Sequence, residues 1–137
     1  CFLSFELSLY FDLSIILPNL SNLSLGKLFS FPKPTSLIRH LVNFATQENS
    51  IVLDFFAGSA TTAHAVMQRN VEENQQCQFI MVQLPEVCDE KTEAAKAGYS
   101  NIAEISKERI RRAAKQIKEK HPDTKADLGF KVFKLID

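Results

Sequence analysis

The sequence is poor in cysteine, has no excess charge of either sign and lacks a long hydrophobic run. Its three cysteines (Cys1, Cys77 and Cys88) are an odd number without C-x-x-C spacing, which argues against a disulfide framework or a zinc site and favours a reducing, cytoplasmic setting. Sixteen basic residues balance sixteen acidic ones, so the net charge does not indicate a polyanionic partner. An uninterrupted run of roughly 18 apolar residues, as a membrane-spanning helix requires, is absent.

At 137 residues the chain fits one domain with a modest core, but residues 1–26 differ in composition from the rest. Leucine or serine occupies half of these 26 positions, and no basic residue occurs among them, whereas a secretory signal begins with positive charge. We interpret residues 1–26 as an atypical N-terminal segment, either a truncated domain edge or an out-of-frame translation. Residues 27–137 have the composition of an ordinary globular protein.

Helical and strand patterns alternate along the remainder of the chain. Helices are expected after Pro34, where Thr35 or Ser36 can cap the first turn, and over residues 61–69 and 101–121. The apolar runs 51–56 and 77–84 are typical of buried parallel strands, residues 86–99 are polar and partly irregular, and 130–137 alternates like a third strand. This order predicts an α/β fold in which a crossover helix joins at least two parallel strands.

The segment between the first strand and the following helix has the chemistry of a ligand site. Residues 58–60 are small, so a ligand can approach the backbone, and Thr61 and Thr62 begin a helix whose N–H groups and dipole favour an anion. Asp54 ends the strand beside them and favours a cation, while two phenylalanines offer surface for a base or a sulfonium. S-adenosylmethionine carries all of these groups. The alternative, that Asp54 only caps the turn and Gly58 only serves backbone geometry, stays open on residue types alone.

Several segments resemble motifs of DNA methyltransferases that modify amino groups. VLDFFAGSATTAHAVM (residues 52–67) resembles their cofactor-binding motif, roughly D-x-F-x-G-S-G-T, and FSFPKPTSLIRHLV (29–42) resembles the Lys-Pro motif that precedes it in the subgroup with permuted motif order. QFIMVQLPE (78–86) resembles the next strand, and residues 98–117 and 127–137 resemble the region beyond. Together they resemble the modification subunit of type III restriction–modification systems, which methylates adenine N6, over residues 26–137.

The resemblance implies a partial Rossmann-like methyltransferase fold that binds S-adenosylmethionine. Asp54 would bind the methionine amino group, residues 58–59 would let the cofactor approach, and residues 61–62 would receive the carboxylate. Phe56 would lie against the cofactor, and the Lys-Pro motif would close the pocket. The implied cofactor contacts are Lys33, Pro34, Asp54, Phe56, Gly58, Ser59, Thr61, Thr62 and Gln83.

Three departures from the family pattern matter. Ala60 replaces the usual second glycine, and Gln83 stands where relatives have an acidic residue for the ribose hydroxyls, with Glu86 three residues later. The D-P-P-Y element that holds the flipped adenine is absent from the 137 residues. The chain therefore looks like a carboxyl-side fragment that grips the methyl donor, with no catalytic residue assigned and no activity expected alone. The implied partners are double-stranded DNA, through the full-length enzyme, and a restriction subunit.

Two other function classes stay open. A nicotinamide-dependent oxidoreductase is disfavoured because G-x-G-x-x-G is missing and the Lys-Pro motif is present. A non-enzymatic module could contact DNA or a partner through helix 101–121, where seven basic residues between Lys107 and Lys120 face two acidic ones, although a solvated face is the expected reading. His64 is expected to be a structural histidine, and Cys77 a core residue.

Overall fold

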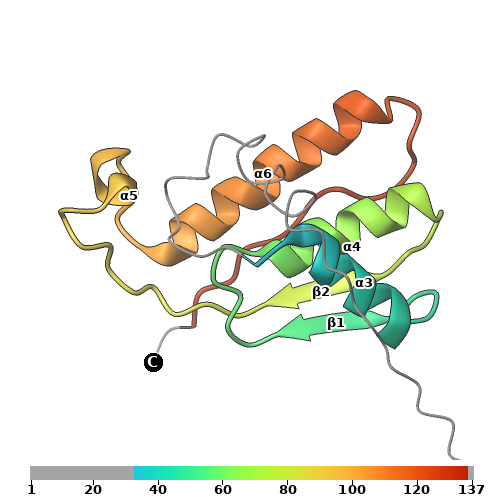
Figure 1. The fold of residues 1–137 in the computed structure, drawn as a ribbon, viewed down its shortest axis with the longest axis horizontal. Helices are drawn as coiled ribbons and strands as arrows, with labels where there is room; N and C mark the ends of the chain where they lie inside the picture. The colour runs from blue at the N-terminus through green and yellow to red at the C-terminus, as the bar shows by residue number, and fades with distance from the viewer. Residues whose placement is uncertain (1–32, 136–137) are drawn as a thin grey trace, which may run out of the picture.

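The computed structural model describes residues 33–135, so the interpretation of residues 1–26 lies outside the described part. Helices and strands alternate as far as β2, and two helices follow (Figure 1): α3 (Thr35–Ala45), β1 (Ile51–Asp54), α4 (Thr61–Glu72), β2 (Gln78–Met81), α5 (Glu93–Lys96) and α6 (Ile102–Lys120). β1 and β2 pair in parallel, with Leu53 opposite Ile80 and Asp54 opposite Met81. The predicted α/β fold with parallel strands and a crossover helix, here α4, is confirmed.

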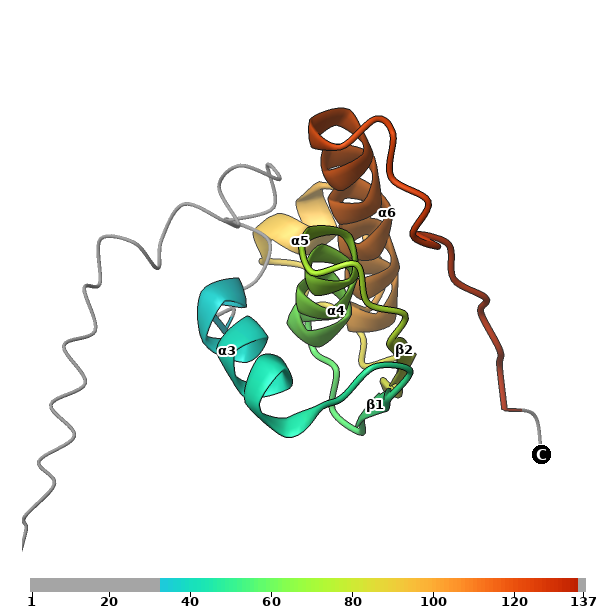
Figure 2. The same ribbon diagram turned by 90° about the vertical axis from the view of Figure 1, so that its right-hand side faces the viewer.

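The helices α3, α4 and α6 form one layer on one face of this sheet (Figure 2). Successive side chains of a strand point to opposite faces of the sheet, so every second residue of β1 and β2 faces the helices. Val52, Phe79 and Met81 point toward the helices and pack against their buried side chains. Both strands therefore end beneath the start of α4, at one edge of the sheet.

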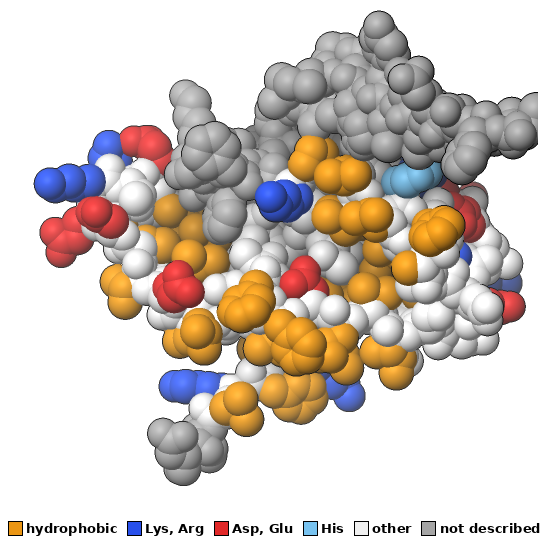
Figure 3. Space-filling model, turned by 60° about the horizontal axis from the view of Figure 1, so that its bottom comes forward, with side chains coloured by type: hydrophobic (Ala, Val, Ile, Leu, Met, Phe, Trp, Pro, Cys, Tyr) orange, Lys and Arg blue, Asp and Glu red, His pale blue; other side chains and the backbone are white. Residues whose placement is uncertain are grey.

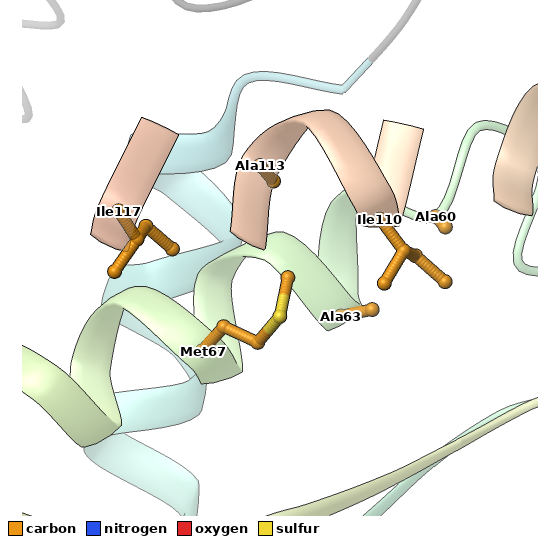
Figure 4. Packing of buried hydrophobic residues seen from close by; sticks show 6 residues of the cluster. All are labelled: Ala60, Ala63, Met67, Ile110, Ala113 and Ile117. Atoms are coloured by element: carbon orange, nitrogen blue, oxygen red, sulfur yellow. The ribbon is translucent and has the colours of Figure 1, made fainter. Parts of the chain in front are cut away.

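Two apolar clusters hold this layer together. The larger one joins the turn before α4, α4 itself and α6, and Figure 4 shows Met67 lying between the two helices. Its buried members are Ala60, Ala63, Met67, Ile110, Ala113 and Ile117. The smaller cluster, Val42, Val66 and Cys77, joins α3 to α4 and to the start of β2. The predicted core position of Cys77 is confirmed, since only 5% of it is exposed.

The first turns of α6 and α3 differ in how they are capped. Asn101 caps α6 through its side chain, which accepts a hydrogen bond from the Glu104 N–H at 3.0 Å. At α3 the cap position is Pro34, which makes no side-chain capping bond. The Thr35 hydroxyl, offered above as a possible cap, instead accepts a hydrogen bond from Arg109.

The sequence prediction of a third strand over 130–137 is wrong for the described residues of that range. Residues 130–135 form no strand. Leu128 and Phe130 pack against the larger core cluster, whereas Phe133 and Leu135 are exposed. The alternating pattern supplies apolar side chains, but the segment pairs with neither β1 nor β2, which pair only with each other. The predicted irregularity of residues 86–99 is confirmed, apart from the one-turn helix α5 and an isolated bridge between Val87 and Asn101.

The other face of the sheet is not covered by any described residue. Ile51, Leu53 and Ile80 point away from the helices and are about half exposed or more. Figure 3 shows hydrophobic side chains gathered across this side of the molecule. Parallel sheets are normally covered on both faces, so the described part has the helical layer of one side only. None of the helices within residues 33–135 combines the length and apolar character needed to span a bilayer.

Candidate functional site

The turn from β1 to α4 has an unusual backbone that opens the start of α4. Gly58 and Ala60 both adopt left-handed conformations, with φ of 51° and 57°. Such φ values cost little for glycine but about 1 kcal/mol or more for alanine. Ala60 is the residue just before α4, and it provides no side-chain cap. The first N–H groups of α4 are therefore left without a capping side chain, as in anion-binding helix starts.

Asp54 lies at the carboxyl end of β1 and faces this helix start. Its Oδ2 accepts a hydrogen bond from the Thr62 hydroxyl at 2.7 Å, and its Oδ1 accepts one from the Phe56 N–H at 3.1 Å. These bonds fix the carboxylate between the strand end and the first turn of α4. Each carboxylate oxygen retains a lone pair for a further donor, so Asp54 can both order the turn and accept a cationic group.

Gln83 joins the second strand to the same turn. Its Oε1 accepts a hydrogen bond from the Gly58 N–H at 2.7 Å, and its Nε2 donates to the Leu84 carbonyl at 3.0 Å. Backbone pairing also continues past the strand ends, because the Ala57 N–H donates to the Val82 carbonyl at 3.1 Å. The predicted site residues Asp54, Gly58 and Gln83 are thus neighbours in space although up to 29 positions separate them in the sequence.

The remaining predicted site residues divide into a buried and an exposed group. Ser59 and Thr61 are buried, and their hydroxyls lie 3.3 Å apart behind the turn. The Lys33 carbonyl accepts a long hydrogen bond of 3.4 Å from the Thr61 hydroxyl, which brings the Lys-Pro segment to the site. Phe56 is 85% exposed and contributes an uncovered aromatic ring beside the turn.

Arg109 of α6 was assigned from the sequence to a solvated basic face, and this is wrong. It is only 1% exposed. Its Nη1 donates to the Ser59 and Thr61 hydroxyls at 2.8 and 2.9 Å, and its Nη2 donates to the Thr35 hydroxyl at 3.0 Å. The signal was present in the sequence, because Arg109 falls four residues after Ile105 and four before Ala113, in the row of buried positions on α6.

Ser106, one turn before Arg109, also contacts the turn. Its hydroxyl lies within hydrogen-bonding distance of the Gly58 carbonyl and of the Ile102 carbonyl. Two side chains of α6 therefore hold the turn from behind, Ser106 at Gly58 and Arg109 at Ser59 and Thr61. Sequence reasoning treated α6 as a packing element with a solvated basic face and missed both contacts.

His64 is a buried residue of α4, as predicted. Its pKa is lowered from the ordinary value of 6.5 to about 4, mainly by burial and in smaller part by the charges of Arg109 and Lys120. Its Nδ1 is buried and has no hydrogen-bond partner among residues 33–135. A neutral imidazole in the interior fits a structural residue better than a proton carrier.

The rest of the basic surface of α6 is largely neutralised within the helix. Lys107 pairs with Glu104, and Arg112 pairs with Glu108 at 2.7 Å. Lys118 donates to backbone carbonyls after the helix, and the Arg111 guanidinium lies 5.8 Å from the centre of the Phe130 ring. Among residues 33–135, no cluster of histidine, cysteine or acidic side chains has the arrangement of a metal site.

Comparison of the sequence with known proteins finds relatives among restriction-modification enzymes. The sequence is 47% identical over 106 residues to the Mod subunit of the StyLTI type III restriction-modification enzyme of Salmonella typhimurium. It is 44% identical over 118 residues to the EcoPI Mod subunit of Escherichia phage P1, and 43% over 108 to the EcoP15I Mod subunit of Escherichia coli. The matches cover 77–86% of this chain but only 16–18% of these relatives.

The family assignment rests on a match over most of the chain. The DNA methylase family of N6 and N4 methyltransferases matches residues 5–116, which include both strands, the turn between β1 and α4, and most of α6. The likeness to type III modification subunits expected from the sequence motifs is thereby confirmed. The chain belongs to the DNA methylase family.

Proposed function

We propose that the turn between β1 and α4 binds S-adenosylmethionine, and that the chain forms the methyl-donor half of a DNA adenine-N6 methyltransferase. The observation that carries the proposal is the position of the Asp54 carboxylate, which is hydrogen-bonded to Thr62 in the first turn of an uncapped helix. A negative group and a helix start thus lie side by side. This pair complements the ammonium and the carboxylate of one methionine moiety.

The other predicted contacts follow from this orientation. With the methionine end at Asp54 and α4, the adenosine would extend toward the end of β2, where Gln83 and Glu86 lie. Gln83 already accepts from the Gly58 N–H, but a second lone pair on its amide oxygen can accept from a ribose hydroxyl. The exposed ring of Phe56 offers apolar surface against the sulfonium or the base.

Methyl transfer needs groups beyond this half-site. The D-P-P-Y element is absent from the sequence, and a flipped adenine has to be held beside the methyl group before its amino nitrogen attacks. We propose that this element belongs to other parts of a longer cytoplasmic protein, as permuted motif order implies, and that they cover the open face of the sheet. The exposed Ile51, Leu53 and Ile80 support that placement. DNA binding and pairing with a restriction subunit would belong to the same longer protein.

The experiment compares cofactors on the 137-residue chain by thermal unfolding. S-adenosylmethionine is expected to raise the melting temperature in a concentration-dependent way, because a ligand that binds only the folded state stabilises it, and NAD is expected to have no effect. Asp54→Ala should abolish the shift, whereas Asp123→Ala, at an exposed aspartate beyond α6, should preserve it. An unmodified chain that responds equally to NAD, or an Asp54→Ala variant that keeps the full shift, would contradict the proposal.

A further inference from the structure

Arg109 places a positive charge directly behind the candidate cofactor site. Its guanidinium reaches three hydroxyls that belong to three segments: Thr35 at the start of α3, Ser59 in the turn, and Thr61 at the start of α4. The planar fork of a guanidinium suits such divergent contacts, whereas an ammonium acts as a single point charge. Arg109 thus fixes the Lys-Pro segment and the turn in one relative position.

The charge of Arg109 is not balanced nearby. All its hydrogen-bond partners within residues 33–135 are neutral hydroxyls, its Nε is buried without a partner, and no ion pair of the described part includes it. Burial lowers its pKa from 12.5 to about 10, so the group still carries its charge at neutral pH. A buried cation without a carboxylate is costly for folding, which indicates a role that compensates for this cost.

We propose that Arg109 is a positioning residue whose charge makes the start of α4 selective for the carboxylate of the bound cofactor, an inference that rests on the proposed function. It acts through Ser59 and Thr61. Because their oxygens accept from the guanidinium, its charge lies beside the turn and the first residue of α4. The buried charge adds to the positive end of the α4 dipole, and in a site of low polarity the two act together on an anion.

The inference predicts which part of the ligand Arg109 affects. S-adenosylmethionine carries the carboxylate, whereas 5′-methylthioadenosine has the same adenosine and S-methyl group, with a neutral thioether in place of the sulfonium and without the amino-acid portion. Removing the charge should weaken binding of the first compound and leave the second unchanged. A merely structural role of Arg109 would weaken both compounds alike, since both need the same turn.

The test is isothermal titration calorimetry of both compounds on the 137-residue chain. Arg109→Met is expected to weaken S-adenosylmethionine binding by about tenfold or more and to change methylthioadenosine binding by less than about twofold. Arg109→Lys should recover part of the loss, because it keeps the charge but not the three contacts. Arg111→Met, on the same helix with a side chain 57% exposed, is the matched control and should bind like the unmodified chain.

Three results would overturn the inference: equal losses for both compounds, an Arg109→Met variant that binds S-adenosylmethionine normally, or a lysine variant no better than the methionine variant. If Arg109→Met does not fold, the lysine variant decides alone, since it should lose affinity for S-adenosylmethionine only. A failure of the proposed function would give a different experimental result from a failure of this inference. In that case the unmodified chain binds neither compound, which removes the basis of this inference as well.

Discussion

The buried histidine of α4 predicts a specific pH dependence of stability. His64 is 4% exposed, and its pKa is lowered from 6.5 to about 4, chiefly by burial and further by the charges of Arg109 and Lys120. Between these two pH values the unfolded imidazole holds a proton that the folded one excludes. The folded state is therefore favoured above pH 6.5 and loses this contribution as the pH falls toward 4.

The pKa difference sets the size of the effect. A pKa lowered from 6.5 to about 4 corresponds to about 3 kcal/mol of unfolding free energy lost over that range. The contribution is large beside the 5–15 kcal/mol or so that is typical of a whole domain. His64→Leu keeps a similar apolar volume without a titrating group and should remove this part of the pH dependence.

The assay is urea unfolding followed by far-ultraviolet circular dichroism at several pH values between 7 and 4, since the chain contains no tryptophan. The difference in unfolding free energy between pH 7 and pH 4 should be about 3 kcal/mol smaller in His64→Leu than in the unmodified chain. His40→Gln, at an exposed position of α3, controls for the loss of an imidazole elsewhere. The reasoning is refuted if His64→Leu and the unmodified chain show the same pH dependence.

Three further variants test the fold around the site. Met67→Ala empties the space between α4 and α6, where Met67 is fully buried, and should lower the unfolding free energy in urea by about 2–5 kcal/mol; a change below about 1 kcal/mol would show that this core is misplaced. Ala60→Val puts a branched side chain at φ 57° and should cost at least about 2 kcal/mol in the same assay, so full stability would contradict the left-handed turn. Leu53→Lys combined with Ile80→Glu places an opposite-charge pair on the open face of the sheet. The unfolding free energy should stay within about 1 kcal/mol of that of the unmodified chain, and the fluorescence of a bound hydrophobic dye should fall. A large destabilisation would mean that this face is covered.

The sequence predicted those parts of the fold that depend on local pattern. The long apolar repeat of α6 and the strand, turn and helix at residues 51–72 each carry their own signal, because burial of one face and the small residues 58–60 are local requirements. The alternation in 130–137 carried a similar signal but led to a wrong prediction, because Leu128 and Phe130 pack against the larger core cluster and the described residues of the segment do not pair with β1 or β2. Where a segment packs is a property of the assembled fold, not of the segment.

The parts of the site that sequence reasoning missed are long-range polar contacts. Arg109 is separated from Ser59 by 50 positions, and charge usually indicates solvent exposure. Only its place in the row of buried positions on α6 could have raised doubt about that assignment. Gln83 was predicted as a cofactor contact because it stands where relatives have an acidic residue for the ribose hydroxyls. Its hydrogen bond to Gly58 additionally required the parallel register of β1 and β2.

The central claim is that one turn, between β1 and α4, holds the methionine part of the methyl donor. Backbone amide NMR of the 137-residue chain during titration with S-adenosylmethionine tests it most directly. The account predicts that the largest shift changes fall on residues 56–62 and on Gln83, and that Asp54→Ala removes them. Changes confined to the far ends of α4 and α6, or none at saturating cofactor, would contradict it.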